Sequence, residues 1–242
     1  RLEHNMGLAK ALNNGILQCK NEIIVRMDSD DVSMPDRVEK QMKAMKEKNA
    51  DIVGSNIIEF VGDISNTGNM RVVPENNEEI IMFAKNRSPF NHPSVMYKKS
   101  AVIEAGFYED YRFFEDYNLW CTMLNKGYKG YNVKENLLYM RGGSEMYKRR
   151  GGVSYVRYIY RFRKHLKKIG FISVGNFLTS VLTRSIVRII PNGLRAALYG
   201  KTLRKQFHTV EEIANGHTEK RLSIKGDTQL QDFARNFNLI MD

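Results

Sequence analysis

Hydrophobic and polar positions first follow helical spacing and then change to strand-like spacing. After Asn5, which can cap a helix, apolar residues recur at intervals of three and four. This spacing predicts an amphipathic helix with a polar outer face. Its predicted buried positions are Leu8, Ala11, Leu12, Ile16 and Cys19. The short β-prone run at 23–27 then predicts a buried strand that stops at a cluster of aspartates.

A strand–helix–strand unit is predicted from residue 23 to residue 57. Ser33, Pro35 and Asp36 match the signals of a helix start, and Val38, Met42 and Met45 are predicted to face inward. The second strand is predicted at 51–57. Short links between such elements favour a mainly parallel sheet flanked by helices, in which ligands bind beyond the carboxyl ends of the strands.

The following segment alternates turn signals with shorter elements. Residues 62–77 are rich in Gly and Asn and predict a loop, residues 89–93 a turn, and residues 94–97 a strand. Gly106 is predicted to end a short helix. A further helix is predicted after Asp116, with Gly127 just past its end and Leu119, Trp120, Met123 and Leu124 inward. Trp120 lies at core spacing, which favours packing over sugar stacking.

Asp28, Asp30 and Asp31 form the densest candidate site. Two carboxylates one residue apart on a tight turn suit Mg²⁺ or Mn²⁺, which complete their coordination with phosphate and water. A solvated turn is the plain alternative. A calcium loop is disfavoured, because Val32 and Met34 stand where it needs oxygen ligands or glycine.

A different enzyme class also matches this cluster. The D-x-D-x-V pattern after an apolar strand resembles haloacid dehalogenase-like phosphatases, in which Asp28 would be the nucleophile. Those enzymes carry a second acidic pair downstream. After Glu115 and Asp116, however, Trp120 stands where the further acid is expected, so the match is partial.

A wider set of motifs resembles the family 2 glycosyltransferases of bacterial polysaccharide assembly over residues 1–150. The motifs are NMGLAKALN at 5–13, RMDSDD at 26–31, PDR at 35–37 with Gln41, HPSVM at 92–96 and EDYNLW at 115–120. The resemblance implies a GT-A fold and an inverting transferase. It also implies that a strand, a helix and a second strand of the catalytic domain are missing before Arg1. A truncated, non-catalytic membrane-binding remnant therefore stays an alternative.

The resemblance also implies roles for individual residues. Asp28 and Asp30 would hold the cation and the ribose and diphosphate of a UDP- or GDP-linked sugar donor, with Asp31 in support. Asp116 would be the general base that deprotonates the acceptor hydroxyl, and Glu115 would position that base or the acceptor. His92 lies in the acceptor-side loop, where it would bind the acceptor or phosphate or simply pack.

Charge divides the chain near residue 147. The net charge is +11, yet residues 148–205 hold fifteen Lys or Arg and no acid. Because aromatic and aliphatic residues alternate with these cations in helical spacing, an interfacial membrane helix is favoured over nucleic-acid binding, and a polyprenyl-diphosphate-linked saccharide fits as acceptor. Residues 169–190 are apolar but interrupted by Asn176, Arg184 and Arg188, which favours lying on a membrane over spanning it.

These observations combine into one prediction for the whole chain. Residues 1–147 would form the C-terminal part of the GT-A domain, 148–206 a basic amphipathic helical extension, and 207–242 a polar tail with a helix near 228–239. Two unpaired cysteines, Cys19 and Cys121, favour a reducing compartment. The predicted location is therefore peripheral, at the cytoplasmic face of the cell membrane.

Overall fold

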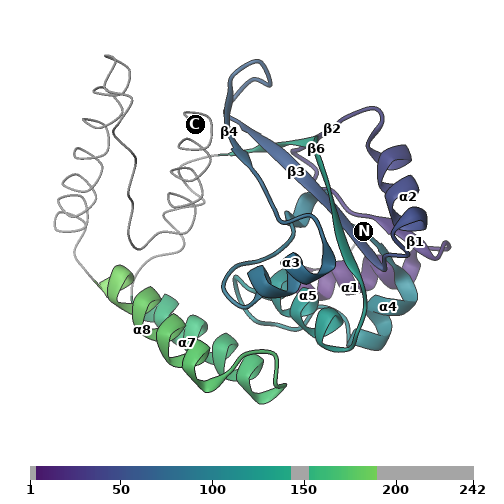
Figure 1. The fold of residues 1–242 in the computed structure, drawn as a ribbon. Coiled ribbons are helices and arrows are strands. Elements are labelled where there is room, and N and C mark those ends of the chain that lie inside the picture. The colour runs from purple at the N-terminus through teal and green to yellow at the C-terminus, as the bar shows by residue number, and fades with distance from the viewer. Residues whose placement is uncertain (1–3, 143–152, 190–242) are drawn as a thin grey trace, which may run out of the picture. The chain divides into compact units, whose positions relative to one another are not determined.

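A six-stranded sheet organises the described part of the chain (Figure 1). The computed structural model describes residues 4–142 and 153–189. The strands are β1 (Ile23–Val25), β2 (Val32–Ser33), β3 (Ile52–Phe60), β4 (Thr67–Arg71), β5 (Met96–Lys98) and β6 (Gly130–Arg141). The helices are α1 (Leu8–Gln18), α2 (Arg37–Glu47), α3 (Asn77–Ala84), the short 3₁₀ helix η1 (His92–Ser94), α4 (Lys99–Ala105), α5 (Glu115–Asn125), α7 (Val153–Lys168) and α8 (Val174–Ile189).

The sheet is mixed, with the strand order β1-β5-β3-β6-β2 and with β4 paired to β3. The predicted strand–helix–strand unit exists as β1, α2 and β3, but β5 lies between its two strands and is antiparallel to both. Among the described strands only β3 and β6 pair in parallel. The prediction of a mainly parallel sheet is therefore wrong for the described residues, while the layered α/β arrangement is confirmed.

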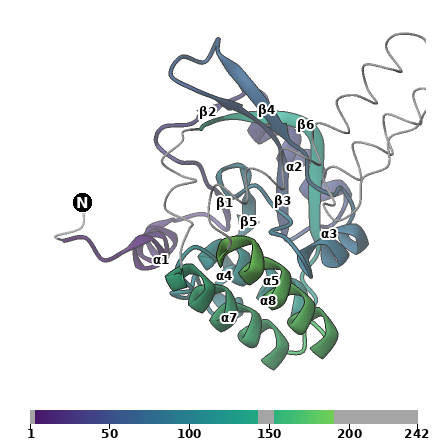
Figure 2. The same cartoon turned by 90° about the vertical axis from the view of Figure 1, so that its left-hand side faces the viewer.

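Helices cover both faces of the sheet, as Figures 1 and 2 show. Successive residues of β3 point to opposite faces of the sheet. Ile52 belongs to the larger apolar core, which includes residues of α1, α3, α4, α5 and α7. Val53 belongs to a smaller core that includes residues of α2. Trp120 is fully buried in the larger core, which confirms its predicted packing role.

The first two helices differ in detail from their predictions. Gly7, not Asn5, is the N-cap of α1; the Asn5 side chain instead accepts a hydrogen bond from the Gly7 N–H at 3.0 Å. Leu8 is 51% exposed because the buried face of α1 is built on Ala9 and Ile16. In α2 the predicted inward residue Val38 is exposed, because the helix turns Arg37 and Gln41 toward the sheet.

The predicted helix start at Ser33 is also wrong. Ser33 lies in β2 rather than at a helix cap, and α2 begins at Arg37 with Asp36 as N-cap. Strand pairing explains the difference, because Ser33 pairs with Leu138 of β6. Only the tertiary structure supplies that partner strand.

The predicted loop at 62–77 contains β4, which forms a hairpin with β3, and the first residue of α3. Nor did the sequence pattern predict β6, whose alternation is broken by register shifts against β3 after Ser55. The predicted strand at 94–97 starts later, at Met96. The helix ends at Gly106 and Gly127 are confirmed, and both glycines have the positive φ that favours this residue.

The helix α7 packs on the same core as the sheet. Tyr155, Ile159, Phe162 and Leu166 are buried there at helical spacing. The described residues up to Arg188 belong to one compact unit. The proposed functional boundary near 147 falls outside the described residues, as do the predicted tail helix at 228–239 and the basic residues beyond 189. Within the described ranges, every helix is too short or too polar to cross a membrane.

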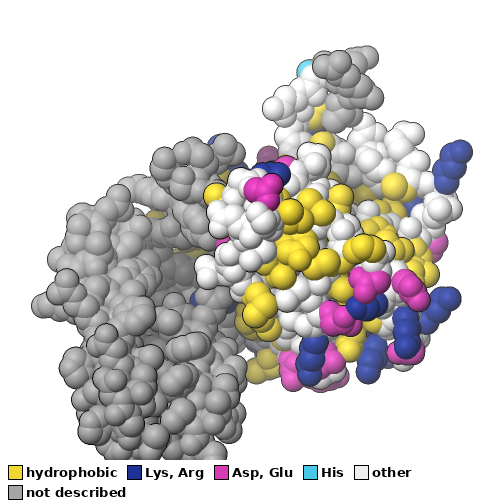
Figure 3. All heavy atoms as spheres, turned by 90° about the horizontal axis from the view of Figure 1, so that it is seen from above, with side chains coloured by type: hydrophobic (Ala, Val, Ile, Leu, Met, Phe, Trp, Pro, Cys, Tyr) yellow, Lys and Arg dark blue, Asp and Glu magenta, His cyan; other side chains and the backbone are white. Residues whose placement is uncertain are grey.

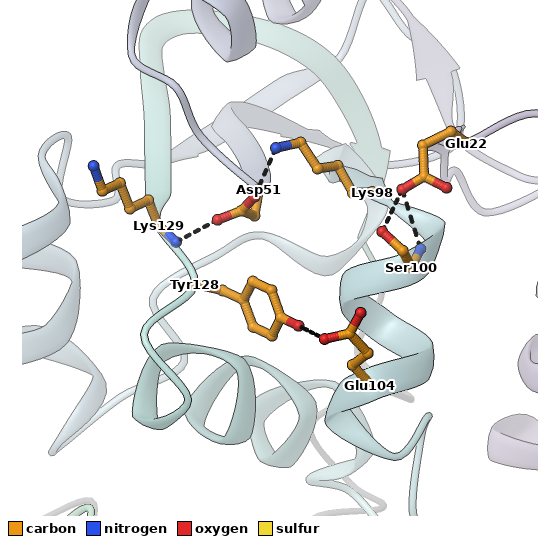
Figure 4. A network of polar contacts seen from close by, with 7 residues as sticks. All are labelled: Glu22, Asp51, Lys98, Ser100, Glu104, Tyr128 and Lys129. Atoms are coloured by element: carbon orange, nitrogen blue, oxygen red, sulfur yellow. Dashed lines mark hydrogen bonds and ion pairs between the residues drawn. The ribbon is translucent and has the colours of Figure 1, made fainter.

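A polar network fastens one end of the sheet (Figure 4). Asp51, just before β3, uses both carboxylate oxygens: Oδ1 pairs with Lys98 Nζ at 2.7 Å and Oδ2 accepts the Lys129 N–H at 2.8 Å. Nearby, the Tyr128 hydroxyl donates to Glu104 at 2.5 Å. This network joins the ends of β3, β5 and β6, and it lies at the opposite end of β5 from the aspartate cluster.

The β3–β4 hairpin leaves large apolar side chains in solvent. Val61, Met70 and Val72 are each more than half exposed. Figure 3, which views the molecule from above, shows hydrophobic side chains gathered in the middle of that face with acidic and basic side chains around them. Apolar surface of this kind is available for contact with other molecules.

Candidate functional site

The three predicted aspartates lie on one turn between β1 and β2. The Asp31 N–H donates to the Asp28 carbonyl at 3.3 Å, which closes the turn. Asp30 is exposed, Asp28 is half-buried and Asp31 is buried. The turn therefore offers two accessible carboxylates beside a third that is buried.

Asp31 is an incompletely paired carboxylate. Its Oδ1 accepts the Arg141 N–H at 2.8 Å, whereas its Oδ2 is buried without a partner among the described residues. Burial raises the pKa of Asp31 to about 6, against the lowering effect of the Arg141 N–H, and repulsion by Asp28 and Asp30 raises it further. A cation at this turn would offset that charge repulsion.

Beneath the turn lies Arg26, a residue that the sequence analysis quoted in a motif but gave no role. Its side chain is only 7% exposed, and its Nη2 donates to Asp28 Oδ1 at 2.5 Å. Its Nε and Nη1 have no partner among the described residues. The available signal was a charged residue two positions after the buried Ile24, because alternation on a strand places both on the same inward face.

A second buried arginine braces the turn from the other face of the sheet. Arg37 Nη2 donates to the Arg26 carbonyl at 2.7 Å, and its Nε donates to the Gln41 side chain at 3.0 Å. Gln41 in turn donates to the carbonyls of Ser94 and Val53 at 2.7 and 3.1 Å. Burial, followed by repulsion from Arg26, lowers the pKa of Arg37 to about 10. These bonds explain why α2 buries two polar residues.

The predicted site residue His92 begins η1 and lies partly buried against aromatic rings. Its Nε2 is 3.1 Å from the Tyr108 hydroxyl, and the rings of both residues lie about 6 Å from Trp120, at 6.0 Å between centroids in each pair. Burial, and then the charge of Arg26, lowers the pKa of His92 well below its usual value. His92 is therefore neutral near pH 7, able to exchange hydrogen bonds but not to act as a cation.

The other predicted acids, Glu115 and Asp116, open α5 as expected. The backbone just before them is strained, because Phe113 has a positive φ of 72°. Aromatic rings of α7 pack against this entry: Tyr155 lies 5.4 Å from Phe113, and Phe162 stacks on Phe114 at 4.7 Å. Burial raises the pKa of Glu115, and repulsion by Asp116 adds to the effect.

Electrostatic interactions connect the two acidic groups through the protein interior. The guanidinium of Arg26, bonded to Asp28, acts on both His92 and Tyr108. Burial is the main cause that raises the pKa of the Tyr108 phenol above its usual value, and the negative charge of Asp116 adds to this increase. His92 and Tyr108, whose side chains lie 3.1 Å apart, are therefore both under the influence of the Arg26 charge, and Tyr108 is also under that of Asp116.

The carboxylates of the turn fit a divalent cation that takes most of its ligands from elsewhere. No group of three or more metal-ligating side chains is assembled within 4–142 and 153–189. Mg²⁺ and Mn²⁺ sites in phosphate-handling enzymes commonly use one or two carboxylates, with phosphate oxygens and water completing the sphere. The exposed carboxylate of Asp30 and the half-exposed one of Asp28 meet that requirement.

The cations of α7 divide between two different roles. Arg163 is only 1% exposed, and its two terminal nitrogens donate to the Lys85 and Asn86 carbonyls at 2.6 and 2.8 Å, at the C-terminal end of α3. It is structural, because it satisfies carbonyls at a helix end. The exposed cations of the helix are Arg157, Arg161, Lys164, Lys167 and Lys168. All of these cations except Arg157 line a shallow depression of about 450 Å³, together with Tyr111 and His165.

Comparison with known proteins supports the motif-based prediction. The model of the family described as Glycosyl transferase family 2 matches residues 1–112. The UDP-Gal:alpha-D-GlcNAc-diphosphoundecaprenol beta-1,3-galactosyltransferase of Escherichia coli is 38% identical over 206 residues, which cover 84% of this chain and 74% of that protein. The amylovoran biosynthesis glycosyltransferase AmsE of Erwinia amylovora is 37% identical over 205 residues, which cover 83% of this chain and 75% of AmsE.

Solved structures agree on the fold. The S. aureus TarS fragment 1–349, in complex with UDP-GlcNAc, superposes with a TM-score of 0.50 at 13% identity. The match covers 68% of this chain and 48% of the TarS fragment, so the chain spans about half of that structure. At this identity the likeness concerns the fold alone, and it confirms the predicted GT-A fold. The family match and the identity of the two bacterial relatives show that the chain belongs to the family 2 glycosyltransferases.

Proposed function

We propose that this protein is an inverting, metal-dependent glycosyltransferase of cell-surface polysaccharide synthesis. It would move a sugar from a UDP- or GDP-linked donor to a saccharide carried on a polyprenyl diphosphate. The observation that carries the proposal is the aspartate turn: Asp28 and Asp30 are accessible to a cation, and the buried Asp31 Oδ2 beside them has no partner among the described residues. Family membership makes the phosphatase interpretation of Asp28 unnecessary.

On the donor side, Asp28 and Asp30 would hold Mn²⁺ or Mg²⁺ together with the diphosphate. The cation supplies charge neutralisation for the departing nucleoside diphosphate. Asp31 holds the turn in shape through its bond to the Arg141 N–H, and its buried, unpartnered oxygen keeps negative charge close to the two outer carboxylates. The protein thus fixes the carboxylates before the donor binds, which lowers the reorganisation needed during reaction.

On the acceptor side, Asp116 would take the proton of the attacking hydroxyl. It lies in the first turn of α5, where the helix dipole favours a carboxylate. Attack of the deprotonated hydroxyl oxygen on the anomeric carbon, from the face opposite the departing nucleoside diphosphate, gives inversion. Glu115 and His92 would orient the acceptor, His92 as a neutral hydrogen-bonding group because burial lowers its pKa.

The name of a relative and the charge of α7 support the proposed lipid carrier. The name of the relative from Escherichia coli includes GlcNAc-diphosphoundecaprenol, a lipid-linked acceptor. In this chain the exposed cations of α7 offer a surface to an anionic membrane, at the cytoplasmic side, where nucleotide sugars are made. Nucleic acid is not proposed as a partner, because apolar residues interleave the cations and no nucleic-acid motif accompanies them.

Transfer to a synthetic acceptor tests the proposal. The full-length protein is incubated with UDP- and GDP-sugars and with GlcNAc diphosphate on a short lipid, with Mn²⁺ or with EDTA. We expect a disaccharide whose new linkage has the opposite anomeric configuration to the donor, and loss of product with EDTA. Product formed equally with EDTA would contradict metal dependence, and no product with any donor, from folded protein that binds vesicles, would favour the non-catalytic remnant.

Binding to lipid vesicles tests the membrane surface separately. Replacing Lys164 and Lys168 by Gln should weaken binding to anionic vesicles by about 30-fold, at about 1 kcal/mol per cation. The same substitutions at Lys43 and Lys46, exposed cations of α2, are the matched control and should change binding much less. Equal losses in both pairs would show that net charge, rather than the α7 surface, decides membrane binding.

A further inference from the structure

Arg26 is held in an arrangement that its one ion pair does not explain. Its side chain is only 7% exposed, yet two of its three guanidinium nitrogens have no partner in the described part of the chain. Buried hydrogen-bond donors without partners are uncommon and unfavourable, so a retained one points to a ligand or to a change of partners. The third nitrogen holds Asp28, a predicted cation ligand.

The side chain and the backbone of Arg26 differ in how firmly they are held. The guanidinium acts electrostatically on His92, Tyr97 and Tyr108, which line the interior between the aspartate turn and α5. Its backbone is fixed on both sides, because its N–H donates to the Val95 carbonyl at 2.9 Å and its own carbonyl accepts from Arg37. The backbone therefore cannot follow a ligand, and only the side chain is free to change partners.

A divalent cation and Arg26 compete for the same carboxylate. Asp28 Oδ1 accepts Arg26 Nη2 at 2.5 Å, so a cation that binds this oxygen meets a guanidinium already in contact with it. The nearby Arg37 adds a second buried positive charge, which disfavours keeping Arg26 beside a bound cation. An anion that arrives with the cation would relieve the repulsion by taking the guanidinium.

We propose that Arg26 exchanges partners during donor binding: it holds Asp28 while the site is empty, and it binds the diphosphate of the nucleotide when a divalent cation takes Asp28. This inference rests on the proposed function for the identity of its ligand. Two parallel N–H donors of one guanidinium match the oxygens of a diphosphate. Arg26 is thus a nucleotide-binding residue that also keeps the empty aspartate turn from being occupied by a cation alone.

Two titrations of Arg26→Gln test the exchange. Without nucleotide, the variant should bind Mn²⁺ more tightly than the wild type, by about 10-fold, because the competing charge is gone; the electron paramagnetic resonance signal of free Mn²⁺ measures this. With saturating Mn²⁺, the variant should bind UDP or GDP more weakly, by about 10- to 100-fold, as expected for a lost charge-assisted hydrogen bond; calorimetry measures this. The opposite directions are the distinguishing result.

Two further variants separate this role from fold or general charge. Arg26→Lys keeps the charge without the fork, so Mn²⁺ binding should stay near wild type while nucleotide binding still falls. Arg141→Gln removes an exposed cation beside the same turn, whose side chain donates to the carbonyls of Asp30 and Gly62 and lies over the Phe60 ring, and it should change both affinities much less than Arg26→Gln.

Parallel weakening of Mn²⁺ and nucleotide binding in Arg26→Gln, or unchanged Mn²⁺ binding, would overturn the exchange. Absence of Mn²⁺-dependent nucleotide binding in the wild type would instead overturn the proposed function. The two failures are therefore distinguishable. The thermal unfolding midpoint of each variant, measured in the same buffers, shows whether the affinities belong to folded protein.

Discussion

The two ends of the sheet both carry acidic side chains beside cations, but they differ in how fully their polar groups are paired. At one end, Asp51 uses both oxygens, one on Lys98 and one on the Lys129 N–H. At the other, one oxygen of Asp31 and two nitrogens of Arg26 are buried without partners among the described residues. A fully paired network stabilises the fold, whereas buried polar groups without partners are candidates for binding a ligand.

The comparison also separates two ways of fixing a polar site. The turn that carries Asp28 is fixed by hydrogen bonds from Arg26, Arg37 and Arg141. The start of α5, which carries Asp116, is fixed by aromatic packing of Phe113 and Phe114 against α7. The difference suits their proposed roles, because rigid packing suits a general base, whereas hydrogen bonds at the turn can change partners when a cation binds.

Asp116→Asn should produce the largest effect, a fall in kcat of about 10²- to 10⁴-fold, because the proposed general base is removed. Binding of the nucleotide donor should be unchanged, since Asp116 lies on the acceptor side. Steady-state kinetics and calorimetry of the same preparation measure the two quantities. Asp110→Asn, an exposed acid in the preceding loop, is the control; a wild-type kcat in Asp116→Asn would refute its role as base.

Asp31→Asn should change how stability depends on pH. The pKa of Asp31 is raised to about 6, so the folded wild type binds a proton that the unfolded chain has already lost between about pH 4 and 6. Its free energy of unfolding should therefore fall as pH rises through that window, by roughly 3 kcal/mol at most. Urea unfolding of both proteins from pH 4 to 7 measures the slopes, and equal slopes would show that Asp31 is not the group responsible.

Asp51→Ala should reduce stability without touching the chemistry. The substitution breaks the ion pair with Lys98 and leaves the Lys129 N–H without its acceptor, which corresponds to about 1–3 kcal/mol of unfolding free energy. The rate per folded molecule should stay at the wild-type value. A large loss of kcat in this variant, measured below its unfolding temperature, would remove the distinction drawn between the two ends.

Tyr128→Phe should give the smallest effect, about 0.5–1.5 kcal/mol of stability, because only the hydrogen bond to Glu104 is lost. The ring remains and its packing is kept. Thermal unfolding measures the change, and the double variant with Glu104→Gln isolates the pair. A double variant that loses the sum of both single effects would mean that the two side chains do not interact.

Local sequence was enough to predict much of this protein. Apolar spacing predicted α1, α2, α5 and the strands β1, β3 and β5, and glycines marked the ends of α4 and α5. The motifs at 5–13, 26–31, 35–37, 92–96 and 115–120 predicted the family, which the comparisons confirmed. Such features need only neighbours in the chain, because helix periodicity, turn chemistry and short motifs are local.

Only the tertiary structure decided which strands pair and which polar groups are buried. β5 between β1 and β3, and β6 with its irregular register, depend on partners far along the chain. For the same reason Arg37 and Gln41 rather than Val38 face inward, since the carbonyls that they satisfy come from other strands. The role of Arg26 could not be predicted from its motif. Its two buried nitrogens without partners are recognised only in the tertiary structure, because burial and the absence of hydrogen-bond partners depend on residues from other parts of the chain.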